Sequence, residues 1–420
     1  MVNLEHVRLD NGLNVYLLND NSKHTTYINL IVKYGGMDNT YYINNKKIVN
    51  KNGMAHLIEH LVLENNVNGD LMSYFGNIGA RSNGITSIDK TVYYVDTVVN
   101  TLECIDKLIY GIHNPIIDDN ILNNVKMPII EEKRRSLDNK YSILYNKSIE
   151  SIQDNKKYTS VLGNIKEISS ITINQIKDAF KTFYRPDNEI VVISGKFDKN
   201  EVLNKLEEVY SKLSFDTSVV TKYKYPHNIK VNKKKYKVKT NTGVGRVLIT
   251  FKLNTINYSG LDKLKLDLYI YSFLRMNFGI ISNLNKELIN NNIVNSGIGF
   301  SNLLLEGYHV INIEGNTNKY NDFIDRILKF INDKEYIFDE DLFNLYKRNY
   351  IVDLIIRNDS IYDITEPFVE NVITYNYDKL DSISEYEKLN FNEFINYINC
   401  LDFTEYSIGI LEDWKNFRYI

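Results

Sequence analysis

The chain has 420 residues, of which 43% are hydrophobic and 25% are charged, as in ordinary globular proteins, and it is too long for one compact core. A net charge of -3 without a stripe of Lys or Arg gives no basis for nucleic-acid binding. No apolar run approaches the roughly 20 residues of a membrane-spanning helix. The first residues do not show the charged start and apolar core of a secretory signal, and Cys104 and Cys400 suit a reducing compartment, so we expect a cytoplasmic protein.

The first half of the chain mixes strand and helix patterns. Asn11-Gly12 is a turn signal between two apolar stretches and predicts a hairpin over residues 7–18. A loop over residues 39–52 is expected to lead into a buried helix. Further helices are predicted near 70–78, 101–112, 121–146, 172–183 and 199–213, and strands at 27–34, 81–86, 90–97 and 190–195. Hairpin-like neighbours interspersed with helices predict an α+β fold.

The second half repeats the plan of the first. A strand followed by an amphipathic helix around Ile105 resembles the pair around Ile324, 219 positions further on. Tandem duplication explains this spacing. The same offset from the metal-binding pattern described next lands on Arg275, where no such pattern exists. We therefore predict two similar domains, of which only the first holds a metal, and a polar linker between them, with the boundaries 1–213, 214–242 and 243–420.

The predicted buried helix over residues 53–65 carries a candidate metal site. His56, Glu59 and His60 lie within about one helical turn, so their side chains share a face. Zinc in a catalytic site takes three protein ligands and keeps one position for water. The two histidines supply two ligands, and the helix predicted over residues 121–146 offers Glu131 and Glu132 for the third. Glu59 is then the candidate general base, which takes a proton from water and passes it to the leaving amine.

Two other interpretations of this pattern remain open. Paired histidines occur on amphipathic helices by chance, and His-x-x-Glu-His arises by accident on the order of once in a hundred such sequences. A purely structural zinc ion is the second alternative. Structural zinc sites are usually closed by four ligands and rich in Cys, whereas neither cysteine lies near this motif in the sequence.

The residues in and around the motif resemble a known family. The run from His56 to His60 looks like the inverted zinc motif of the M16 metallopeptidases, which include pitrilysin, insulinase and the mitochondrial processing peptidase. Other stretches resemble landmarks of the same family in the same order: 53–55, 79–87, 91–94 and 183–195. The resemblance is specific over residues 1–212 and diffuse over residues 230–420, and it points to the half-size bacterial members.

This resemblance implies a zinc site and a substrate-binding strand. His56 and His60 match the family's zinc ligands and Glu59 its catalytic base. Glu132 matches the third ligand, with its neighbour Glu131 as the alternative. The segment after residue 79 resembles the edge strand on which family members lay an extended peptide, which fits β-augmentation. The substrate-binding residues expected there are Ala80, Ser82, Asn83, Gly84 and Thr86.

Two features depart from the family pattern. The family commonly keeps another carboxylate two helical turns before the metal-binding Glu, where this chain has Val125. Many active members also place an Arg and a Tyr in the second half to hold the substrate, and the similar stretch here has Ile289 and Ser296. The first departure leaves the support of the metal ligands undefined. The second means that the transition state must be stabilised by other groups or by a partner subunit.

The leading hypothesis is a zinc-dependent endopeptidase that hydrolyses unstructured peptides, such as leader peptides, precursor segments or oligopeptides. The family pattern makes two α+β domains half of an M16 clamshell, so we expect a homodimer or a heterodimer with an M16 paralogue. The alternative is a non-catalytic binding or scaffold subunit of an M16-type heterodimer. All four expected site residues are present in the sequence, and this favours an enzyme over a scaffold subunit. They are His56, Glu59, His60 and Glu132.

Overall fold

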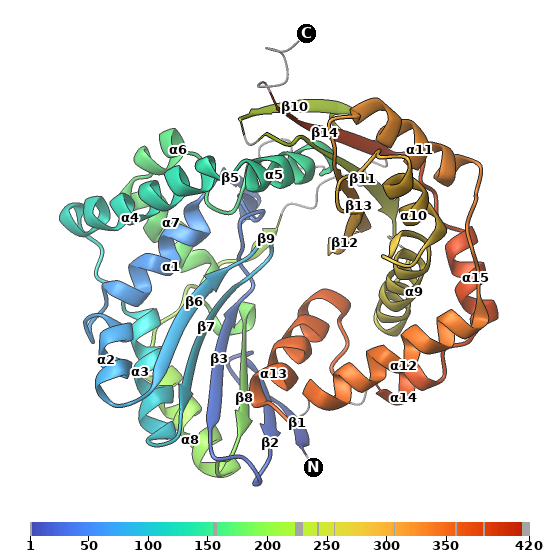
Figure 1. Ribbon diagram of the computed structural model, residues 1–420. Helices are drawn as coiled ribbons and strands as arrows, with labels where there is room; N and C mark the ends of the chain where they lie inside the picture. The colour runs from blue at the N-terminus through green and yellow to red at the C-terminus, as the bar shows by residue number, and fades with distance from the viewer. Residues whose placement is uncertain are drawn as a thin grey trace. The chain divides into compact units, whose positions relative to one another are not determined.

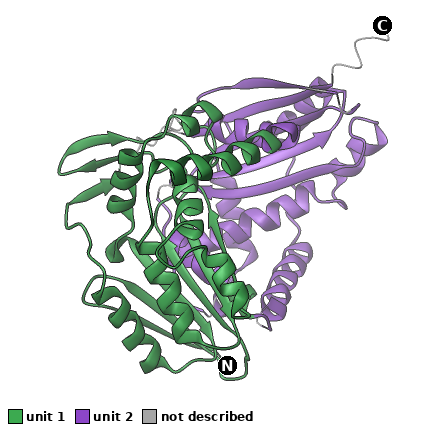
Figure 2. Cartoon of the chain, turned by 90° about the vertical axis from the view of Figure 1, so that its left-hand side faces the viewer, with its two compact units in different colours: residues 1–135, 157–224, 361–365 green, residues 136–156, 225–360, 366–420 purple. Residues whose placement is uncertain are grey.

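The chain forms two compact units, each built on one large sheet with helices packed on it (Figures 1 and 2). Residues 1–135, 157–224 and 361–365 form unit 1, and residues 136–156, 225–360 and 366–420 form unit 2. The predicted α+β class with two similar domains is thus confirmed. The computed structural model describes residues 2–153, 158–222, 230–241, 243–255, 257–305, 307–357, 359–380 and 383–413.

Unit 1 contains a six-stranded sheet in the order β1-β2-β8-β3-β7-β6. These strands are β1 (Asn3–Arg8), β2 (Asn14–Asn19), β3 (Thr26–Val32), β6 (Arg81–Thr86), β7 (Thr91–Thr97) and β8 (Glu189–Gly195). A second sheet joins β4 (Thr40–Ile43), β5 (Lys46–Val49) and β9 (Val220–Lys222). The helices are α1 (Met54–Glu64), α2 (Leu71–Asn77), α3 (Thr101–His113), α4 (Asp119–Asp138), α6 (Ile165–Ser169), α7 (Ile173–Phe183) and α8 (Lys199–Ser211), with a 3-10 turn at Pro186–Asn188.

Unit 2 contains a five-stranded sheet in the order β10-β14-β11-β13-β12. Its strands are β10 (Lys235–Thr240), β11 (Arg246–Asn254), β12 (Ile298–Leu305), β13 (Tyr308–Asn316) and β14 (Tyr406–Asp413). Its helices are α5 (Lys140–Ile152), α9 (Leu261–Phe278), α10 (Asn283–Asn290), α11 (Tyr320–Asn332), α12 (Glu340–Arg357), α13 (Ile361–Glu370), α14 (Ile383–Glu387) and α15 (Phe391–Asn399), with a π-helical turn at Asn371–Tyr375. The first five residues of α13 group with unit 1.

The two large sheets share one strand plan, as the internal repeat predicts. In sheet order, β2, β8, β3, β7 and β6 of unit 1 correspond to β10, β14, β11, β13 and β12 of unit 2. In each sheet the first of these pairs is parallel and the following pairs are antiparallel. The helices α3 and α11, which follow β7 and β13, have 13 residues each and start 219 positions apart, at Thr101 and Tyr320.

Two predicted elements of the first half are wrong in detail. The stretch 39–52 is not a plain loop, because β4 and β5 pair within it. Their turn is formed by Asn44 and Asn45, which have φ of 47° and 66°, a left-handed conformation that Asn tolerates better than most residues. The single helix predicted at 121–146 is two helices. Asn139 separates them, and its side chain accepts hydrogen bonds from the first backbone N–H groups of α5, as an N-cap does.

The predicted domain boundaries do not coincide with the residues that make up the two compact units. The helix α5 lies within the predicted domain 1–213 but packs with β10, β11 and β14 of unit 2. The predicted linker 214–242 carries β9 and β10 in its described part, while residues 223–229 and 242 lie outside the described residues. In β10 the lysines alternate with buried Tyr236 and Val238, the period of a strand with one buried face. The lysine cluster concealed that period.

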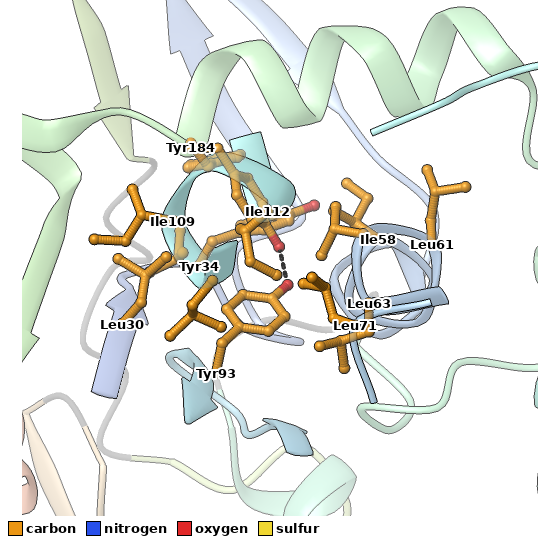
Figure 3. Close-up of a cluster of buried hydrophobic side chains, with 14 of the residues drawn as sticks. Leu30, Tyr34, Ile58, Leu61, Leu63, Leu71, Tyr93, Ile109, Ile112 and Tyr184 are labelled. Atoms are coloured by element: carbon orange, nitrogen blue, oxygen red, sulfur yellow. Dashed lines mark hydrogen bonds between the residues drawn. The ribbon is translucent and has the colours of Figure 1, made fainter. Parts of the chain in front are cut away.

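Burial of α1 organises the core of unit 1. Nine of its eleven residues are buried, and it packs against β6 and β7 and against α2, α3 and α7 (Figure 1). Figure 3 shows Ile58, Leu61 and Leu63 of this helix in a cluster that also contains the hydrogen-bonded pair Tyr93 and Tyr184, whose hydroxyl oxygens are 2.5 Å apart. The apolar side chains of α1 therefore fix which of its faces is left for polar residues.

A glycine allows β6 to approach α1 closely. A Cβ added at Gly84 of β6 would lie 2.6 Å from Leu63 Cδ1 and 2.8 Å from Glu59 Oε1, which is closer than atoms pack. The strand and the polar face of the helix thus come into direct contact because this position has no side chain.

A buried ion pair ties α3 to the sheet of unit 1. The His113 Nε2 atom lies 2.9 Å from Glu189 Oε1, and the Nδ1 atom lies 2.8 Å from the carbonyl oxygen of Ile109. Both partners only accept hydrogen bonds, so the ring carries both protons. Burial acts to lower the pKa of His113, but the charge and hydrogen bond of Glu189 outweigh it and the pKa is raised.

We predict that this pair makes stability fall at alkaline pH. Because the folded pKa of His113 exceeds the unfolded value of about 6.5, the contribution is fully present below that pH and is lost as pH rises through the folded pKa. Glu189→Gln should cost about 3–5 kcal/mol at pH 6 and remove most of the slope. Unfolding free energies at about pH 6 and about pH 9 test this. The control is Glu207→Gln, at an exposed carboxylate; equal slopes in both variants would contradict the account.

Candidate metal centre

Three side chains from α1 and α4 converge in unit 1. The imidazole rings of His56 and His60 have centroids 4.8 Å apart. The Glu132 Oε2 atom lies 3.5 Å from His56 Nε2 and 4.0 Å from His60 Nε2. In the described part of the chain, this is the only group of three or more His, Cys, Asp and Glu side chains whose ligand atoms are close enough to hold one metal ion, with all of them within 4.8 Å of one another.

The spacing and chemistry of this group fit zinc. Ligand atoms about 2.0–2.1 Å from a tetrahedral zinc ion are about 3.3 Å from one another, close to the 3.5 and 4.0 Å measured from Glu132. Two imidazole nitrogens and one carboxylate oxygen are also a donor set of catalytic zinc sites, which keep a fourth position open. Burial, with a smaller effect of His60, lowers the pKa of His56 to about 3, so this ring is neutral and has a lone pair for a metal.

Glu59 lies beside the three candidate ligands and is held by β6. Its Oε2 atom is 4.0 Å from His56 Nε2 and accepts a hydrogen bond of 2.6 Å from the Thr86 hydroxyl. Burial raises the pKa of Glu59, and the hydrogen bond from Thr86 and the proximity of His60 offset part of that effect. A carboxylate with a raised pKa is a better proton acceptor than an exposed one, which suits a general base.

Glu64, which the sequence did not single out, contacts the second histidine. The Glu64 Oε1 atom lies 2.9 Å from His60 Nδ1, and the two residues are one turn apart on α1. Burial acts to lower the pKa of His60, but this hydrogen bond and the carboxylates of Glu59, Glu64 and Glu132 outweigh it, so the pKa is raised. The i, i+4 spacing of the two residues was the sequence signal for this contact.

The structure separates the two candidates for the third ligand. The side chain of Glu132 faces the histidines, whereas Glu131 Oε1 accepts a hydrogen bond from Arg134 and the Glu131 side chain is half exposed. Adjacent residues on a helix point about 100° apart, so only one of them can reach the site. The geometry favours Glu132.

A pocket of about 460 Å³ lies over this group, and β6 forms one of its walls. Of the expected substrate-binding residues, Asn83, Gly84 and Thr86 line the pocket, whereas Ala80 and Ser82 do not. Ala80 is buried before the strand begins, and its backbone N–H donates to the Phe75 carbonyl oxygen. Apolar residues that sequence reasoning missed also line the pocket: Leu63, Met72, Ile85, Val161 and Leu162.

The positions that depart from the family pattern are not among the residues that line this pocket. Val125 of α4 is a buried core residue of unit 1. Ile289 lies in α10 of unit 2, and Ser296 is exposed in the same unit. None of the three side chains carries a charge.

A buried glutamate beside a His-His-Glu group, under a strand at the end of a sheet, is an arrangement typical of zinc hydrolases. Two family models match the sequence of this chain. Residues 14–162 match the insulinase family, peptidase family M16, and residues 170–350 match the M16 inactive domain. The chain therefore belongs to the M16 peptidase family.

Related proteins and structures support this membership. The uncharacterized zinc protease YmfH of Bacillus subtilis is 26% identical over 75% of this chain and 74% of its own length. The yeast mitochondrial-processing peptidase subunit beta is 26% identical over 39% of this chain and 36% of its own length. An M16-like peptidase from Alicyclobacillus acidocaldarius superimposes with a TM-score of 0.87 at 19% identity over 98% of both chains. Pitrilysin does so with a TM-score of 0.73 at 17% identity over 98% of this chain and 45% of its own.

Among the described residues, no helix combines the length and the apolar composition needed to cross a bilayer.

We predict that Glu132 and not Glu131 is needed to retain zinc. After loading and dialysis, wild type and Glu131→Ala should hold about one zinc ion per chain, whereas Glu132→Ala should lose most of it, because two imidazoles alone leave a three-ligand site incomplete. Metal analysis by mass spectrometry measures this. Loss of zinc from Glu131→Ala alone would contradict the assignment.

Proposed function

We propose that this protein is a zinc-dependent endopeptidase that hydrolyses unstructured peptides bound as an extended strand along β6. The observation that carries the proposal is the position of Glu59, which lies 4.0 Å from a candidate zinc-binding histidine and is hydrogen-bonded to the strand that lines the pocket. Relatives of this chain are named zinc proteases. The donor set of His56, His60 and Glu132 would hold the ion.

The residues of the site have separate tasks. Zinc, when bound, supplies a Lewis acid that polarises the peptide carbonyl group and lowers the pKa of water. Glu59 accepts a proton from the attacking water and delivers it to the departing amine. Thr86 holds the Glu59 carboxylate through its hydroxyl group, so the base keeps one orientation while the peptide binds. Each of these tasks falls to a side chain of unit 1.

The position of β6 favours extended substrates. It is the last strand in the order of the large sheet and pairs with β7 on one side, which leaves its other edge for a peptide. Backbone hydrogen bonds to an edge strand make few demands on sequence, but the peptide must be unfolded to form them. Leader peptides, precursor segments and oligopeptides meet that requirement.

The proposal extends to the assembly of the chain and to the place where it acts. Relatives include a subunit of the mitochondrial-processing peptidase and a component of complex III, so we propose that the chain acts as a homodimer or with an M16 paralogue. A cytoplasmic location remains a prediction from the sequence. The alternative of a non-catalytic scaffold subunit is disfavoured by the convergence of three candidate ligands and a base in one pocket.

We predict that Glu59→Gln abolishes hydrolysis and retains zinc. The amide cannot accept the proton from water, so the turnover number should fall 10²-fold or more, while zinc content should equal that of wild type because Glu59 is not among the candidate ligands. Quenched unstructured peptides, assayed with and without a co-expressed paralogue, measure the rate. Equal activity in both proteins, or a wild type without metal, would refute the proposal.

We also predict that the Thr86 hydroxyl affects turnover more than peptide binding. Thr86→Val keeps the shape of the side chain and removes the hydrogen bond to Glu59, which at about 1.5–3 kcal/mol corresponds to a loss of about tenfold to hundredfold in kcat. Thr86→Ser keeps the hydroxyl and should retain most of the activity. Comparable kcat values for the Val variant and wild type would show that the strand does not position the base.

A further inference from the structure

We propose that Glu64 is a positioning residue that orients His60 for the metal. The inference rests on the proposed zinc site, but it concerns a residue outside the set of ligands and base. It starts from one contact: the Glu64 Oε1 atom lies 2.9 Å from His60 Nδ1.

The contact determines which nitrogen of His60 faces the metal. An ionised carboxylate only accepts hydrogen bonds, so the proton of the neutral ring resides on Nδ1. The lone pair is then on Nε2, the atom that lies 4.0 Å from Glu132 Oε2 in the candidate ligand group. Glu64 therefore selects the tautomer that can bind and holds the plane of the ring. Metal-binding histidines almost always donate their second N–H to such a partner.

The other candidate histidine ligand has no such hydrogen-bond partner. The His56 Nδ1 atom is buried and has no hydrogen-bond partner among the described residues. Glu64 is thus the one side chain of the described residues that hydrogen-bonds the Nδ1 atom of either candidate histidine ligand.

The size of the effect follows from the exposure of Glu64. Removing such a partner typically weakens metal binding 10–100-fold. The Glu64 side chain is 39% exposed, so solvent competes for the hydrogen bond and we expect a loss near the lower end of that range, about tenfold.

Zinc affinity measured by chelator competition provides the first test. Glu64→Leu should weaken binding about tenfold, and Glu64→Gln should weaken it less because the amide oxygen still accepts the hydrogen bond. The matched control is Glu207→Gln, which removes the same charge from an exposed position on α8 and should leave the affinity unchanged. Equal affinities for Glu64→Leu and Glu207→Gln would overturn the proposal.

A second test uses the metal-free protein. Two-bond ¹H–¹⁵N spectra of protein labelled at its seven histidines report the tautomer of each neutral ring, and His60→Gln assigns the signal. At alkaline pH, where the ring of His60 is neutral, we expect its Nδ1–H form in wild type and a shift toward Nε2–H in Glu64→Leu. An Nε2–H form in wild type would overturn the inference whatever the activity. Normal results in both tests without peptide hydrolysis would instead refute the proposed function alone.

Discussion

The packing of α1 against the sheet of unit 1 is the constraint on which the site depends. Its apolar residues, among them Ile58 and Leu61, are fixed in the core. This fixes the rotation of the helix about its axis and therefore the orientation of its polar edge. That edge carries His56, Glu59 and His60. Because Gly84 lets β6 approach this edge, the same packing brings the pocket-lining strand to the candidate base. One buried helix thus sets the geometry of the ligands, the base and the peptide-binding edge.

This arrangement places ionisable groups in an environment that opposes their charge. Burial lowers the pKa of His56 and raises that of Glu59, and both shifts disfavour the charged forms. A fold selected for stability alone would place apolar residues at these positions. The stability lost by burying these groups is consistent with a functional site, because residues with perturbed pKa values cluster at active sites.

Much of the fold was predictable because its signals are local and repeated. The turn at Asn11-Gly12 forms the expected hairpin, and the spacing of 219 residues recurs in α3 and α11. The short strands β4 and β5 were not predicted because their turn residues, Asn44 and Asn45, are equally typical of a loop. The grouping of α5 with unit 2 depends on tertiary packing that no local pattern records.

The candidate site divides along the same line. The i, i+3 and i+4 spacing of residues on α1 shows that His56, Glu59 and His60 share a face. Helical spacing leaves Glu131 and Glu132 open, and only the family resemblance pointed to Glu132 before the orientation of its side chain favoured it. The contact of Thr86 with Glu59 joins a strand to a helix 27 residues away, so it could not be predicted from the sequence. Helical spacing could have revealed Glu64, since it follows His60 by one turn.

The central claim is that a metal binds at the junction of α1 and α4 with one position left open for chemistry. Crystals of the zinc-loaded protein, measured at the zinc absorption edge, test it most directly. The account predicts one anomalous peak about 2.0–2.2 Å from His56 Nε2, His60 Nε2 and a Glu132 oxygen, with water as the fourth ligand. A peak elsewhere, or a shell closed by a fourth protein side chain, would contradict it.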